Sequence, residues 1–173
     1  MDEKTEPNAA TQLALQYKPE QVKILLIGEA PGRADKNFYL GNNNLYRTVI
    51  VAFKQLYGEF SSRDEFLAFF KSAGCFLDHI GLEHTERHDL EKRKANRQNG
   101  IISLSEKLKI YQPETVIILM KALEKQVQQA IDLSAITSIK HQTTVSYPAG
   151  SDTNRLACIR GLVAILQVSV PDF

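Results

Sequence analysis

The chain has 173 residues, of which 43% are hydrophobic and 24% are charged, and its formal net charge is +1. This composition excludes an intrinsically disordered class and argues against a protein that coats nucleic acid through its overall charge. The apolar runs are far shorter than the roughly 20 residues that span a bilayer, so we expect no membrane partner. We expect a single domain over residues 1–173, with 1–8 at its periphery.

The cysteines and the amino terminus bear on cofactors and localisation. Cys75 and Cys158 are too few and too far apart for a zinc or iron–sulfur framework, and we interpret both as small buried residues. The opening MDEKTEPNAA is acidic and polar, unlike a signal peptide. We therefore expect a cytoplasmic protein without a cofactor.

The first predicted elements surround a conspicuous loop. A short helix over 9–17 precedes an apolar run at 22–27, which is typical of a strand buried on both faces. The run ends in the pentapeptide GEAPG, residues 28–32. A polar loop then leads to Asn44, which we predict as the N-cap of the next helix.

The rest of the chain continues to alternate helices and strands. The segment 81–97 is polar, mixed in charge and without clear periodicity, and its basic part, 87–97, is either a solvated surface or a contact for DNA. Helical spacing, capping boxes, apolar runs and Gly or Pro stops predict, in chain order, helix 45–57, helix 62–73, strand 75–80, helix 99–111, strand 114–120, helix 121–131, strand 139–147 and helix 153–166.

This alternation predicts an α/β fold, a three-layer α/β/α sandwich around a central, mainly parallel four-stranded sheet. Ligands of such sheets bind outside the carboxyl ends of the strands. The pentapeptide 28–32 follows the first strand directly, so its position alone makes it the leading candidate site. A turn that merely ends the strand is the alternative.

The composition of this loop narrows the kind of ligand. Gly28 and Gly32 let backbone amides approach a ligand closely, and Pro31 fixes one backbone torsion. The loop is not a Walker-type phosphate loop, because no Gly-Lys-Ser/Thr follows. It is not a dinucleotide fingerprint either, because it leads into a polar loop and not directly into a helix.

Several stretches resemble the uracil-DNA glycosylase superfamily. They are LLIGEAPG, the FY pair at 38–39, NNNLYR at the start of a helix, EFLAFFKSAGCFLD, PETVIIL and SYPAGSDTNRLACIRGL. The GEAPG form is similar to that of the superfamily's iron–sulfur members. The resemblance covers most of the chain and implies an enzyme that flips a damaged base out of DNA and hydrolyses its N-glycosidic bond.

The resemblance also implies roles for particular residues. The first loop would position the attacking water, an aromatic residue would stack on the base, a residue at the end of the second strand would contact the base edge, and a second loop would stabilise the leaving base. The base-binding residues would be Gly28, Ala30, Pro31, Gly32, Phe38, Tyr39 and Asp78. The second loop would comprise Tyr147, Pro148, Ala149, Gly150 and Ser151, and phosphate contacts would come from Arg33, Lys36 and Arg155.

The chain departs from the superfamily's pattern at several of these positions. Ala30 stands where an Asp or Asn would hold the water, which leaves Glu29 as the catalytic candidate for a general base. Asp78 replaces an Asn, and an ionised carboxylate only accepts hydrogen bonds, which disfavours uracil and suits a base that presents two donors. Tyr147 replaces a His, and its neutral hydroxyl can still donate to a developing negative charge.

Iron–sulfur and metal sites have less support. The four cysteines of the iron–sulfur branch are missing, so we expect no cluster. His84 and His88 lack the carboxylates that would complete a metal site, and no metal is predicted. For each candidate residue an ordinary structural role is the alternative: a capping carboxylate for Glu29 or Asp78, a hydrophobic plug for Phe38 and Tyr39, and a solvated cation for the basic residues.

Three functions follow as hypotheses. The first is a DNA glycosylase, and the second is a catalytically inactive relative that binds a nucleobase, a nucleotide or nucleic acid in the same pocket. The third is an unrelated small-molecule enzyme that uses the same crevice, because a fold does not determine a function.

Overall fold

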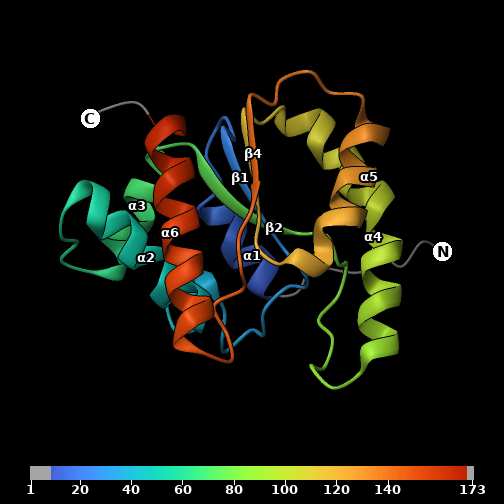
Figure 1. Cartoon of the computed structure of the whole chain (residues 1–173), viewed down its shortest axis with the longest axis horizontal. Helices are drawn as coiled ribbons and strands as arrows, with labels where there is room; N and C mark the ends of the chain where they lie inside the picture. Colours follow the sequence, from blue (N-terminus) through green and yellow to red (C-terminus); the bar gives the residue numbers. More distant parts are fainter. Residues whose placement is uncertain (1–8, 171–173) are drawn as a thin grey trace.

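Four parallel strands form the central layer of the protein, whose computed structural model describes residues 9–170 (Figure 1). The strand order is β2-β1-β3-β4, and all three neighbouring pairs are parallel. The strands are β1 (Ile24–Gly28), β2 (Cys75–His79), β3 (Thr115–Ile118) and β4 (His141–Thr144). Because every strand runs in the same direction, the loops that follow β1 and β2 emerge at the same edge of the sheet.

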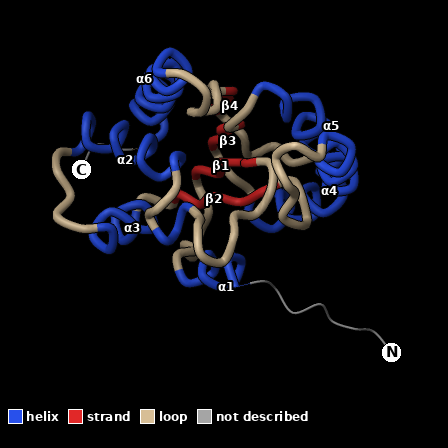
Figure 2. The backbone as a smooth tube through the Cα atoms, turned by 90° about the horizontal axis from the view of Figure 1, so that it is seen from below, coloured by secondary structure: helices blue, strands red, loops and turns tan. Residues whose placement is uncertain are grey.

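Helices cover both faces of this sheet (Figure 2). One layer contains α2, α3 and α6, the other contains α4 and α5, and α1 lies beside β2. The bounds are α1 (Ala9–Gln16), α2 (Asn44–Tyr57), α3 (Arg63–Ser72), α4 (Leu90–Tyr111), α5 (Glu124–Ser134) and α6 (Asp152–Ser169), with short 3-10 helices at Phe38–Leu40 and Lys121–Leu123. The predicted three-layer α/β/α sandwich is confirmed, and the sheet is parallel throughout its described strands.

The largest difference from the predicted elements is the start of α4. The sequence predicts a helix from 99, but α4 begins at Leu90, and the Asp89 side chain caps it by accepting a hydrogen bond from the Lys92 amide. The first turns of α4 have no apolar stripe because most of their side chains are exposed or form ion pairs, so hydrophobic periodicity could not reveal them.

Smaller differences concern the ends of other elements. Strand β4 is shorter than the predicted 139–147 because it pairs only with β3, which is itself four residues long. The cap of α2 is Asn43 and not Asn44, and the cap of α6 is Ser151 and not Asp152, which the sequence pattern favours and which is the first residue of the helix. Residues 1–8, predicted to be peripheral, lie outside the described part of the chain.

The buried side chains of both helical layers and the sheet form one hydrophobic cluster. Its aromatic part joins α2 to α3, where the rings of Phe53, Phe66 and Phe70 pack together. Cys75 and Cys158 are buried and not disulfide-bonded, which confirms their interpretation as core residues. Within residues 9–170, no helix combines the length and hydropathy needed to cross a membrane.

Candidate functional site

A cavity of about 680 Å³ opens at the carboxyl edge of the sheet. Its walls come from α1, the loop after β1, the segment 36–45, the end of β2, the segment 81–87, helix α4 and the loop after β4. The cavity therefore lies where the topology of a parallel sheet places ligand sites. Of the residues predicted from the sequence, those lining it are Gly28, Glu29, Ala30, Pro31, Gly32, Arg33, Lys36, Phe38, Tyr39, Asp78, Tyr147 and Ala149.

The loop 28–32 needs its glycines for close packing. A Cβ atom at Gly28 would lie 3.0 Å from Cδ2 of His79, and one at Gly32 would lie 2.6 Å from Cβ of Asn37. The loop is also fastened to the segment after β2, since the Glu29 carbonyl accepts a 2.7 Å hydrogen bond from the Gly81 amide. These contacts give the cavity a fixed wall.

Glu29 is the centre of an ion-pair cluster with two arginines of α4. Its Oε1 accepts from Nε of Arg93 at 2.6 Å and its Oε2 from Nη2 of Arg93 at 3.1 Å, while Nη1 of Arg97 lies 3.5 Å from Oε2. The Glu29 side chain is 11% exposed. The hydrogen bond from Arg93 to Glu29 raises the pKa of the guanidinium. Two cations therefore engage both oxygens of the carboxylate proposed as a general base.

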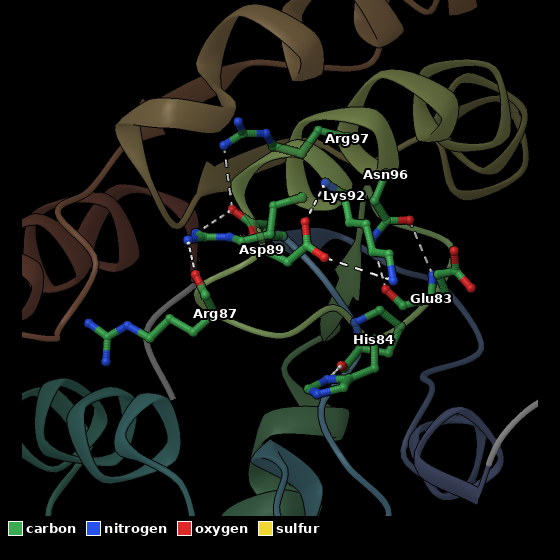
Figure 3. Close-up of polar contacts among 10 residues, drawn as sticks. Glu83, His84, Arg87, Asp89, Lys92, Asn96 and Arg97 are labelled. Carbon is green, nitrogen blue, oxygen red and sulfur yellow. Dashed lines mark hydrogen bonds and ion pairs between the residues drawn. The ribbon is translucent and has the colours of Figure 1, made fainter.

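The contacts that hold the segment 81–89 against this cluster are visible in Figure 3. The Asn96 side chain accepts from the Leu82 amide at 3.0 Å and donates to the Glu83 carbonyl at 2.7 Å. Arg93 donates from Nη1 to the Arg87 carbonyl at 3.0 Å, while the Arg87 side chain extends away from the cluster (Figure 3). The polar segment 81–89, for which the sequence predicted no helix or strand, is thus held by hydrogen bonds along one side of the cavity.

Phe38 and Tyr39 line the cavity but are 2% and 3% exposed. The Tyr39 hydroxyl accepts from the Leu77 amide at 2.9 Å and donates to the Leu77 carbonyl at 3.2 Å, and its ring stacks on Tyr17 at 5.5 Å. The Phe38 ring packs edge-on against Tyr39. The pair therefore anchors its loop to the core, as the alternative interpretation expects. The Tyr39 hydroxyl also pairs the backbone groups of Leu77 on the outer edge of β2.

Asp78 stands near the end of β2 and is hydrogen-bonded on both carboxylate oxygens. Oδ1 accepts from Nζ of Lys107 at 3.0 Å and from the His79 amide at 2.8 Å, and Oδ2 accepts from the Tyr111 hydroxyl at 2.9 Å. Burial alone would raise the pKa of this carboxyl, but Lys107 and the other partners outweigh burial, so the pKa lies below its ordinary value. Asp78 is therefore ionised at neutral pH.

The neighbouring His79 has a different electrostatic character. Burial lowers its pKa to about 4, and this effect exceeds the opposing attraction of Asp78. The imidazole is therefore neutral at pH 7 and carries no charge into the cavity wall that it forms beside Gly28.

The second loop is divided between the cavity and α6. Tyr147 and Ala149 line the cavity, and the Tyr147 side chain is partly exposed with no hydrogen bond to its hydroxyl from the described residues. Burial raises the pKa of Tyr147, so its hydroxyl stays protonated. Pro148, Gly150, Ser151 and Arg155 are not part of the lining, and Ser151 instead caps α6.

Helix α4 supplies the site residues that sequence reasoning missed. Arg93, Arg97, Lys107 and Tyr111 hold the two carboxylates of the cavity wall, although only Arg97 lies outside the lining itself. Their spacing places them on one face of a helix and could have indicated the site, but only if the helix is predicted to begin at Leu90. Two cations of the basic run 87–97 point inward, whereas Arg87, Lys92 and Lys94 are exposed.

Across residues 9–170, no group of three or more His, Cys, Asp or Glu side chains is arranged to hold a metal ion. No protein-family model matches the chain, and no curated protein sequence matches it.

Proposed function

We propose that this chain is a divergent uracil-DNA glycosylase-like protein that takes a flipped base of DNA into the cavity and hydrolyses its N-glycosidic bond. One observation supports the proposal above others. The loop after β1, the end of β2 and the loop after β4 are far apart in the sequence, yet all three line the same cavity. These are the segments to which the sequence resemblance assigns water positioning, base-edge contact and leaving-group stabilisation.

The proposed reaction forms a bond between a water oxygen and C1′ of the sugar while the bond from C1′ to the base nitrogen breaks. Glu29 acts as the general base that takes the proton of the attacking water, and this proton ends on the base or in solvent while negative charge develops on the departing base. No group among residues 9–170 accepts a hydrogen bond from the Tyr147 hydroxyl, whose pKa burial raises, so its proton is available to that base. Arg93 and Arg97 together exceed the charge of Glu29 by one, which favours an anion at this wall.

A second candidate is a protein that binds the base without cleaving it. The observation in its favour is the pairing of both Glu29 oxygens with Arg93 and Arg97, which competes with the activation of a water. The loop 28–32 has no polar side chain besides that of Glu29, because position 30 is Ala30. In this case the cavity recognises the base, and the bound nucleic acid leaves unchanged.

Base release from defined oligonucleotides tests the proposal. Single- and double-stranded oligonucleotides that carry one uracil, hypoxanthine or xanthine are incubated with the protein and treated with alkali, which cleaves the strand wherever a base is missing. We expect cleavage at one or more of these bases, abolished in Glu29→Gln and retained in Glu83→Gln. The Glu83 side chain is exposed, so that variant is a matched control for the loss of one carboxylate.

The other outcomes separate the alternatives. Binding without strand cleavage, measured by fluorescence anisotropy, would support the second candidate and contradict the first. The absence of both binding and cleavage would contradict both, and would favour a small-molecule enzyme that uses the same cavity.

A further inference from the structure

A lysine of α4 changes what the Asp78 carboxylate can recognise. Lys107 donates from Nζ to Oδ1 of Asp78 at 3.0 Å, and both side chains line the cavity. The Asp78 side chain is 15% exposed and that of Lys107 is 36% exposed. The pair is therefore held together by the fold and remains within reach of a ligand in the cavity.

The unused hydrogen-bonding capacity of the pair is of two kinds. A carboxylate offers about four acceptor positions, and Asp78 uses three of them, for Lys107, the His79 amide and the Tyr111 hydroxyl. The remaining position lies on Oδ2. The Lys107 ammonium has three N–H donors, and among the described residues only Asp78 accepts from it. A ligand thus meets one free acceptor next to free donors.

We propose that Lys107 is a specificity-determining residue, which together with Asp78 selects a base whose edge carries a carbonyl beside a ring N–H. The inference rests on the proposed function, because it concerns the base that the same cavity would take. Asp78 alone presents only acceptors and would suit an edge with two donors. With Lys107 beside it, the pair is complementary to an edge with one acceptor and one donor, as in uracil, hypoxanthine and xanthine.

The chemistry of the two partners sets the orientation of the base. An ammonium binds most strongly to a carbonyl oxygen, on which charge develops as the base leaves. A ring N–H next to a carbonyl is more acidic than an amino group and is the stronger donor to a carboxylate. Cytosine carries an amino donor where uracil has the carbonyl and an acceptor nitrogen where uracil has the ring N–H, so in the same orientation neither position pairs with Lys107 or Asp78.

Ligand-detected NMR with free bases tests this inference without requiring catalysis. The probes are uracil, cytosine and 3-methyluracil, in which a methyl group replaces the donor hydrogen. We expect the protein to prefer uracil over each of the others by roughly tenfold, the size of one good bidentate contact. Lys107→Met should reduce the ratio of uracil to cytosine binding toward one, whereas the preference over 3-methyluracil, which depends on the Asp78 acceptor, should persist. Lys109→Met is the matched control, because Lys109 is on the same helix and pairs only with the exposed Glu106 among the described residues.

A double variant separates specificity from folding. Lys107→Met leaves Asp78 without its cation and can weaken the fold. In Lys107→Met with Asp78→Asn, however, the amide alone supplies one donor and one acceptor. We expect this double variant to regain the preference for uracil. A preference for uracil over cytosine that survives Lys107→Met, or equal binding of uracil and 3-methyluracil by the unmodified protein, would overturn the inference.

The inference and the proposed function can fail separately. If uracil-containing DNA is cleaved at the same rate by the unmodified protein and by Lys107→Met, the glycosylase proposal stands and the role of Lys107 is contradicted. If free uracil is preferred in a Lys107-dependent manner while DNA is neither bound nor cleaved, the role of Lys107 stands and the DNA function is contradicted. If the protein binds none of the free bases, the role of Lys107 is contradicted, whether or not DNA is bound or cleaved.

Discussion

At the scale of the residue, the ion pairs of Glu29 decide how firmly the loop after β1 is held. We predict that Glu29→Gln lowers the free energy of unfolding by about 2 kcal/mol, because two largely buried guanidinium groups lose their counter-charge. Urea unfolding of this variant and of Glu83→Gln measures the effect. Equal stability of the two variants would show that the cluster contributes nothing to the fold.

Two tyrosines of the cavity wall differ in what their hydroxyl groups contact. The Tyr39 hydroxyl bonds both backbone groups of Leu77, so we predict that Tyr39→Phe costs about 1–3 kcal/mol of stability by leaving buried polar groups unpaired. Tyr147→Phe should leave stability unchanged, because the described residues give its hydroxyl no partner, and should instead weaken base release. Urea unfolding and the oligonucleotide assay distinguish these effects; the reverse pattern would contradict both assignments.

At the scale of the element, helix α4 depends on a close approach to the end of β2. A Cβ atom at Gly100 would overlap the carbonyl of Ile80. Alanine normally favours a helix over glycine by about 1 kcal/mol. We nevertheless predict that Gly100→Ala lowers the free energy of unfolding by about 2 kcal/mol or more, since the helix must move away from the strand.

The control for this prediction is Asn99→Ala, one residue away on the exposed side of the same helix. It raises helix propensity without a clash, so its stability in urea should equal or slightly exceed that of the unmodified protein. A stabilising Gly100→Ala would mean that α4 does not pack against β2 as described.

At the scale of the whole molecule, the buried His79 couples stability to pH. Its pKa is about 4 in the folded protein and 6.5 ordinarily. Between these values the unfolded chain binds a proton that the folded chain does not, so stability falls as the pH falls. We predict a loss of about 3 kcal/mol from pH 6.5 to pH 4. Urea unfolding across this range should show a flatter dependence for His79→Gln than for His141→Gln; parallel curves would contradict it.

Sequence patterns predicted β1 and β3 well because both are buried, mostly aliphatic runs, whereas β4 is polar and its extent was predicted less accurately. They located the cavity as well, since the GEAPG loop follows the first of those runs and the sheet topology fixes which edge binds ligands. The start of α4 could not be predicted in this way. Arg93 and Arg97 of its first turns face the cavity wall and pair with Glu29, so this face of the helix has no apolar residues that a hydrophobic pattern could detect. The partnership of Asp78 with Lys107, 29 positions away, required the fold.

NMR shift mapping with a short uracil-containing single strand tests whether the cavity takes a base of DNA, because it locates the bound base whether or not cleavage follows. We expect perturbed amides to converge on the cavity, at Gly28–Ala30, Gly32, Asp78 and Ala149. Perturbations confined to the separate groove between α5 and β4, lined by residues such as Gln128 and Thr143, or no perturbation at saturating strand, would contradict it.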